Sequence, residues 1–117
     1  MADITDPKKE ALARRSPTPT PISVRRAGRE LAENVATWRR LRGLTSAQVA
    51  ERAGVGRETV SRLEKDASSV SVESLLRILR VLGVMDGVVA ATDPYETDVG
   101  RLRADEQLPQ RVREPRR

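Results

Sequence analysis

Long polar side chains recur at helical spacing between residues 57 and 65 of the chain. On a wheel of about 100° per residue, Val60 and Leu63 point to one side, which suits a buried face. The opposite side and its flank carry side chains that form hydrogen bonds: Arg57, Glu58, Ser61, Arg62 and Lys65. A guanidinium can fork onto guanine N7 and O6, and a carboxylate can accept from cytosine N4. This pattern therefore favours hydrogen bonding to base edges in a DNA major groove, although a solvated helix surface would show the same pattern.

The residues around this helix contain what is needed to hold it in place. Thr45 and Gln48 have the Thr-x-x-Gln spacing of a capping box, which starts a helix. Gly54 can adopt the positive φ that a sharp turn requires, and Ala50 is small where a second helix must cross closely. Apolar residues that could hold the two helices together are Val49, Ala53, Val55, Val60 and Leu63. The segment 44–63 therefore predicts two short helices joined by a tight turn.

This arrangement resembles the helix-turn-helix of the lambda-repressor-like (Xre) family of DNA-binding proteins. The resemblance runs without a gap from Val35 to Val84. It implies an all-α fold, a lambda-repressor-like DNA-binding domain of four to five short helices. From capping signals and apolar spacing, we expect these helices at about residues 27–42, 46–53, 57–65, 72–82 and 85–91. The apolar stripe of the first helix predicts that Trp38 lies in the core.

The same resemblance implies roles for individual side chains. It assigns base reading to Arg57, Glu58, Ser61 and Arg62. It assigns phosphate contacts to Arg39, Thr45, Ser46 and Lys65. The residues with structural roles are Ala50 and Gly54 at the turn, and Arg39 and Glu64 as an ion pair.

Composition divides the chain into three parts. Residues 1–26 contain Ser-Pro-Thr-Pro-Thr-Pro and few apolar groups to offset the entropy lost on ordering, so we expect a disordered basic arm. Residues 27–92 hold the helix-turn-helix DNA-binding domain. Residues 93–117 begin with an Asp-Pro pair, which is typical of a helix start, so we expect a C-terminal helix to about residue 106 and then a flexible tail. One face of that helix would carry Tyr95, Val99 and Leu102.

Composition also excludes several classes of function. The chain has no Cys and no His, which removes disulfides, thiolate metal sites and the commonest general base. No close pairing of carboxylates suggests a pocket, so we expect no enzyme activity, no metal and no cofactor. No apolar run approaches the roughly twenty residues of a membrane span, and the N-terminus lacks the apolar segment of a secretory signal. We therefore expect no membrane association and a cytoplasmic location.

The expected partner is double-stranded DNA, bound by a homodimer, because one such domain contacts few bases and two half-sites lie about 34 Å apart. Candidate dimer contacts, which could instead cap the domain's own core, are Leu82, Val84, Met85, Val88 and Val89. The favoured function is a sequence-specific transcriptional regulator, in this family most often a repressor. One alternative is an antitoxin similar to HipB-type proteins, which autoregulates its operon and holds a toxin partner, here through residues 93–113. Another is a helical protein-interaction adaptor without DNA binding.

Overall fold

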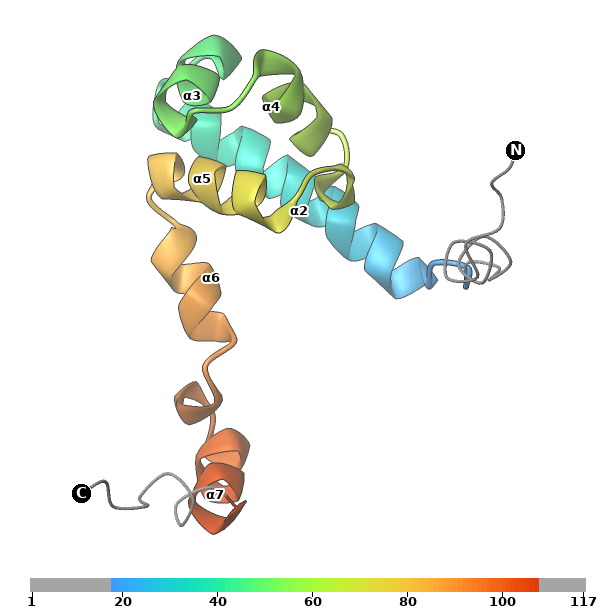
Figure 1. Ribbon diagram of the computed structural model, residues 1–117, viewed down its shortest axis with the longest axis vertical. Helices are drawn as coiled ribbons and strands as arrows, with labels where there is room; N and C mark the ends of the chain where they lie inside the picture. Colours follow the sequence, from blue (N-terminus) through green and yellow to red (C-terminus); the bar gives the residue numbers. More distant parts are fainter. Residues whose placement is uncertain (1–17, 108–117) are drawn as a thin grey trace, which may run out of the picture.

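The computed structural model describes residues 18–107, which form helices and turns and contain no strand. The element order is α2 (Ile22–Leu41), α3 (Ser46–Ala53), α4 (Arg57–Leu63), η1 (Ala67–Ser69), α5 (Val72–Leu82), α6 (Met85–Ala91), η2 (Pro94–Glu96) and α7 (Asp98–Gln107). Figure 1 shows α2, α3, α4 and α5 gathered into one domain, from which α6 and α7 extend. The predicted all-α fold is confirmed for this part of the chain. Residues 1–17 and 108–117, which include most of the predicted arm and the tail, lie outside the described residues.

Helix α2 begins earlier than the sequence predicted. Its first residue is Ile22, before the expected start at residue 27, and it follows Pro21 in an extended conformation. The Pro21 carbonyl accepts hydrogen bonds from the amides of Val24 and Arg25, both at 3.1 Å. Because no glycine or proline lies in this first turn, the helix extends from its packed part back to Pro21, and the proline disfavours helical backbone at the residue before it. The predicted boundary of the arm at residue 26 therefore falls inside a helix.

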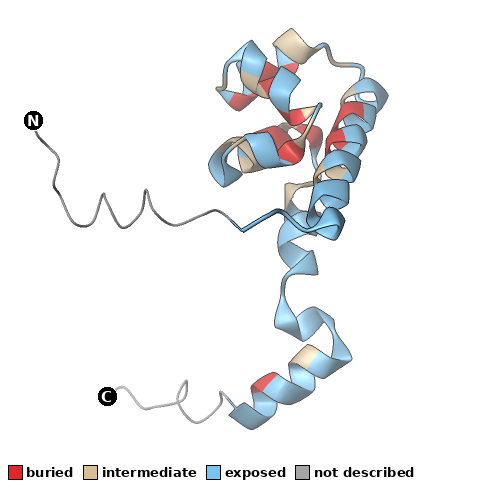
Figure 2. Cartoon of the chain, turned by 90° about the vertical axis from the view of Figure 1, so that its right-hand side faces the viewer, coloured by how far each residue is buried: buried red, intermediate tan, exposed pale blue. Residues whose placement is uncertain are grey.

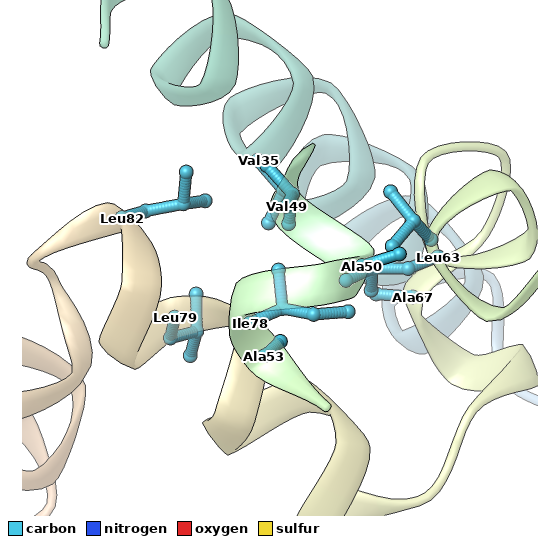
Figure 3. Close-up of a cluster of buried hydrophobic side chains, with 10 residues drawn as sticks. Val35, Val49, Ala50, Ala53, Leu63, Ala67, Ile78, Leu79 and Leu82 are labelled. Atoms are coloured by element: carbon cyan, nitrogen blue, oxygen red, sulfur yellow. The ribbon is translucent and has the colours of Figure 1, made fainter. Parts of the chain in front are cut away.

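The core of the domain is aliphatic; α3 packs on both α4 and α5, and α2 packs on α5 and η1 (Figure 3). Its buried members are Val35, Val49, Ala50, Ala53, Val60, Leu63, Ala67, Ile78, Leu79 and Leu82. Figure 2 shows that burial is concentrated in this domain. Each of the larger side chains contributes about 1.5–3 kcal/mol on burial, so the core fixes how α3 and α4 lie relative to each other.

Trp38 was expected in the core, and that prediction was wrong. The residue is 38% exposed, because the inward stripe of α2 consists of Ala32, Val35 and Ala36. The Arg42 guanidinium lies 5.0 Å from the centre of the Trp38 ring, a cation–π distance. Together they form a surface feature at the C-terminal end of α2.

The C-terminal part of the described chain differs from the single helix predicted after residue 93. Asp93 caps only the short η2, since its carboxylate accepts from the Tyr95 amide at 2.9 Å. Thr97 is then extended, and its hydroxyl accepts from the Gly100 amide at 2.9 Å, so a second capping residue starts α7. Tyr95 therefore lies outside α7, and it remains exposed together with Val99 and Leu102. None of the helices within residues 18–107 combines the length and the hydrophobicity of a membrane-spanning segment.

Candidate nucleic-acid interface

The turn between α3 and α4 has the geometry that the sequence predicted. The Thr45 hydroxyl accepts from the Gln48 amide at 3.1 Å, and the Gln48 side chain accepts from the Thr45 amide at 2.9 Å. Gly54 ends α3 with φ 74° and ψ 34°. The amides of Gly54 and Val55 both donate to the carbonyl of Ala50, at 2.9 and 3.0 Å. Ala50 is buried under this turn, so the capping box, the small residue and the glycine all lie at the turn.

Helix α4 is anchored on one side and open on the other. Val60 and Leu63 are fully buried against the core. Exposed residues occupy the opposite side and its flank: Arg57, Glu58, Ser61, Arg62 and Lys65. The helix ends at Leu63 rather than at the predicted residue 65, and Lys65 lies in the following turn, where its amide donates to the Arg62 carbonyl at 3.1 Å. The predicted polar face is thus presented on a rigidly held helix.

Arg39 and Glu64 form the predicted ion pair. Arg39 Nε lies 2.7 Å from Glu64 Oε2, and the two side chains are 16% and 15% exposed. A second guanidinium nitrogen donates to Glu64 Oε1 at 3.2 Å, and the third donates to the Leu44 carbonyl at 3.0 Å. The hydrogen bond that Arg39 donates to the Glu64 carboxylate raises the pKa of Arg39, although burial opposes it. Arg39 therefore joins α2 to the start of α3 and the end of α4. Only some of its guanidinium N–H groups remain to donate to another acceptor.

The start of α3 presents backbone amides at the surface. The capping box satisfies the Gln48 amide, and the Val49 amide donates to the Thr45 carbonyl at 3.0 Å. The first two helical amides, of Ser46 and Ala47, are those that a capping box leaves for an external acceptor. Because these amides sit at the positive end of the helix dipole, this end of α3 suits a phosphate group.

The candidate dimer residues separate into two groups. Leu82 is 0% exposed and belongs to the domain core, so its prediction as a dimer contact was wrong. Val84 and Met85 are partly buried against the same core. Only Val88 and Val89 on α6 present substantial surface, at 39% and 56% exposed. After α5, Val84 and Met85 therefore cover the domain core, while Val88 and Val89 remain exposed.

Two connections were not predicted from the sequence. Asp66 caps η1, with its carboxylate accepting from the amide and the hydroxyl of Ser68 at 3.0 and 2.8 Å. The amide hydrogen bond, followed by the hydroxyl, lowers the pKa of Asp66. The Asp-x-Ser spacing of an Asx turn could have indicated this cap. Arg42 Nε donates to the Leu82 carbonyl at 2.9 Å, a contact between distant residues that no local pattern signals.

The segment that contains this turn matches a known protein family. Residues 35–84 match a family model described as helix-turn-helix. The matched segment starts in α2, covers α3, α4 and α5, and ends directly before α6. A search of curated proteins finds no match to the chain.

Proposed function

We propose that the protein is a sequence-specific regulator that reads the major groove with α4, because residues 35–84 match a helix-turn-helix family model and resemble the lambda-repressor-like (Xre) DNA-binding domains. The observation that carries the proposal is the exposed polar face of α4 opposite its two buried anchors. Arg57 and Arg62 would each fork onto guanine, while Glu58 would accept from cytosine or restrain a neighbouring arginine. Ser61 lies between them and can donate or accept.

Phosphate contacts would fix the register of α4 in the groove. The proposed contacts are the amides at the start of α3 with Thr45 and Ser46, the remaining donors of Arg39, and the ammonium of Lys65. Such contacts position a protein without reading sequence. The ion pair with Glu64 supports this role for Arg39, because it holds the guanidinium beside the start of α3.

The experiment that tests this function is a mobility-shift titration at two salt concentrations, on a duplex selected from a random library. Arg62→Ala should weaken binding by about 1–3 kcal/mol and relax preference at one base pair, whereas Lys65→Ala should weaken binding to all sequences alike. The Lys65 variant should also show a shallower salt dependence. Neutral results for both variants would remove α4 as the reading helix. If the wild-type protein bound no duplex at low salt, the adaptor without DNA binding would replace the regulator.

We propose a homodimer as the active form and repression by blocking promoter access as the mode of action. Two copies would place two α4 helices at half-sites about 34 Å apart. The exposed pair Val88 and Val89 supports α6 as the contact. Sedimentation should show two copies on a palindromic duplex, and Val88→Asp should reduce this to one. A single copy bound without cooperativity would reject the dimer. With DNA as the partner, a cytoplasmic location is part of the proposal.

A second candidate, the antitoxin, is favoured by the segment that follows the domain. Between residues 93 and 107 the chain carries exposed Tyr95, Val99 and Leu102 on elements that extend from the domain (Figure 1). Exposed apolar groups of this kind suit a protein partner. Co-expression with the product of the neighbouring gene tests the idea: a complex lost on deletion of residues 93–113 supports the antitoxin, and its absence leaves the regulator alone.

A further inference from the structure

The first half of α2 lies outside the matched family segment and carries a basic surface. Arg25, Arg26 and Arg29 are exposed there. Among residues 18–107, the ion pairs are Arg39–Glu64, Arg77–Glu73 and Arg101–Asp98, so no described carboxylate pairs with these three arginines. As far as residues 18–107 are concerned, these guanidinium groups are free to bind an external anion.

This half of α2 lies beside the turn that follows the reading helix. α2 packs against η1, and a Cβ added at Gly28 would lie 2.9 Å from the Asp66 carboxylate. Gly28 therefore lets α2 approach the turn closely. Arg29 is near enough to help lower the pKa of Asp66. Asp66 directly follows Lys65, the proposed phosphate contact. Arg29 therefore lies near the C-terminal end of α4, as Lys65 does.

Helical geometry gives the direction in which these arginines point. At about 100° per residue, Arg25 lies within about 40° of Arg39 around α2, and Arg29 lies within about 80° on the same side. Arg39 faces the end of α4 through Glu64. Trp38 and Arg42 point to the other side, where Arg42 contacts the Leu82 carbonyl. Arg25 and Arg29 therefore share the side of α2 that faces α4.

The spacing along α2 fits the width of the groove that α4 would occupy. Ten residues separate Arg29 from Arg39, a rise of about 15 Å, and the major groove of B-DNA is about 12 Å wide. The start of α3 would face the phosphates on one rim of the groove, and Arg39 reaches from there to Glu64 at the end of α4. Arg29 would face the phosphates beside Lys65, and Arg25 lies one turn further out.

We propose that Arg25 and Arg29 form a second phosphate-binding site, which contacts the DNA strand on the rim of the groove next to Lys65. The inference rests on the proposed function, because it requires α4 to lie in the groove. Arg29 also offsets the negative charge of Asp66, which would otherwise repel a phosphate at this position. Glu30 lies about 100° from Arg29 around α2, whereas Glu33 lies only about 40° from Arg29 and lines the same surface hollow, so a bound phosphate would have the Glu33 carboxylate as a neighbour.

The test compares two charge-matched variants on the selected duplex. Arg25→Gln with Arg29→Gln removes the proposed site, while Arg80→Gln with Arg103→Gln removes two exposed arginines on α5 and α7. Each phosphate contact contributes about −0.9 to the slope of log K against log salt. The first variant should therefore reduce the slope by about 1.8, and its affinity loss between 50 and 200 mM salt should be about twelvefold smaller than that of the wild type. The control should keep the wild-type slope, and both should keep the wild-type melting temperature.

Two results separate failure of this site from failure of the function. If wild-type protein binds, Arg62→Ala weakens binding, and both charge variants show the wild-type slope, then Arg25 and Arg29 do not contact phosphate and only this inference falls. Equal slope changes in both charge variants would also overturn it, since net charge alone would then explain the effect. If wild-type protein binds no duplex, both the proposed role of α4 and the proposed second phosphate site are rejected.

Discussion

Substitution of Gly54 by alanine is expected to destabilise the domain through two separable effects. Gly54 has φ 74°, and left-handed backbone costs a residue with a side chain about 1–2 kcal/mol. The new Cβ would also lie 3.0 Å from an Arg77 guanidinium nitrogen, which donates to the Ala53 carbonyl at 3.2 Å. Displacing that hydrogen bond adds about 0.5–1.5 kcal/mol. The expected loss in the free energy of unfolding is therefore about 1.5–3.5 kcal/mol.

Two other glycines provide matched controls for this substitution. Gly43 has φ 70° with nothing within 4 Å of an added Cβ, so Gly43→Ala isolates the backbone term. Gly87 lies within α6 and also faces open space. Alanine there should be neutral or stabilise by up to about 1 kcal/mol. Replacing glycine by alanine also lowers the conformational entropy of the unfolded chain, which stabilises the folded state. This stabilisation is common to all three variants and cancels in their comparison.

Urea unfolding followed by circular dichroism measures the series. The expected order of stability loss is Gly54→Ala, then Gly43→Ala, with Gly87→Ala last. If Gly54→Ala cost no more than Gly87→Ala, the turn between α3 and α4 would not depend on left-handed backbone. Equal losses at positions 54 and 43 would show that the Arg77 contact contributes nothing.

Further variants test the core, the cap, the ion pair and the Asx turn. Leu63→Ala should cost about 2–5 kcal/mol in urea unfolding, because the side chain is fully buried, and a loss below 1 kcal/mol would place Leu63 outside a packed core. Thr45→Ala should cost about 1 kcal/mol through loss of the cap, while Thr45→Ser should retain most of that stability. A double-mutant cycle of Arg39→Gln and Glu64→Gln should show a coupling energy of about 0.5–3 kcal/mol, and zero coupling would contradict the ion pair. The lowered pKa of Asp66 means that its ionised form stabilises the native state above the unfolded pKa of about 3.9 and that this contribution disappears as pH falls through the lower folded pKa. Acid unfolding of Asp66→Asn should therefore lack this component, and a variant with the wild-type pH dependence would count against the Asx turn.

Local signals in the sequence were sufficient to predict the helix-turn-helix unit. The capping box at Thr45, the left-handed Gly54 and the buried spacing of Val60 and Leu63 each depend on neighbours within one or two turns. The Arg39–Glu64 pair is a long-range contact, and the family resemblance implied it.

The remaining features depend on packing that local patterns do not encode. Trp38 follows the apolar spacing of α2 but lies at the edge of the buried stripe, where Arg42 covers it. Leu82 and Val88 belong to one apolar run, and only the departure of α6 from the domain separates core from surface. The approach of Gly28 to Asp66 arises from the crossing of α2 and η1, so the position of Arg29 could not be predicted.

The most direct test of the central claim, that α4 reads base edges with Arg62, replaces single guanines by 7-deazaguanine in the selected duplex. This analogue removes the N7 acceptor from the major groove and leaves the backbone unchanged. At one position it should weaken wild-type binding by about 1–3 kcal/mol, with no further loss for Arg62→Ala. If every single replacement weakened both proteins equally, or neither, Arg62 would not be reading a guanine and the account would be contradicted.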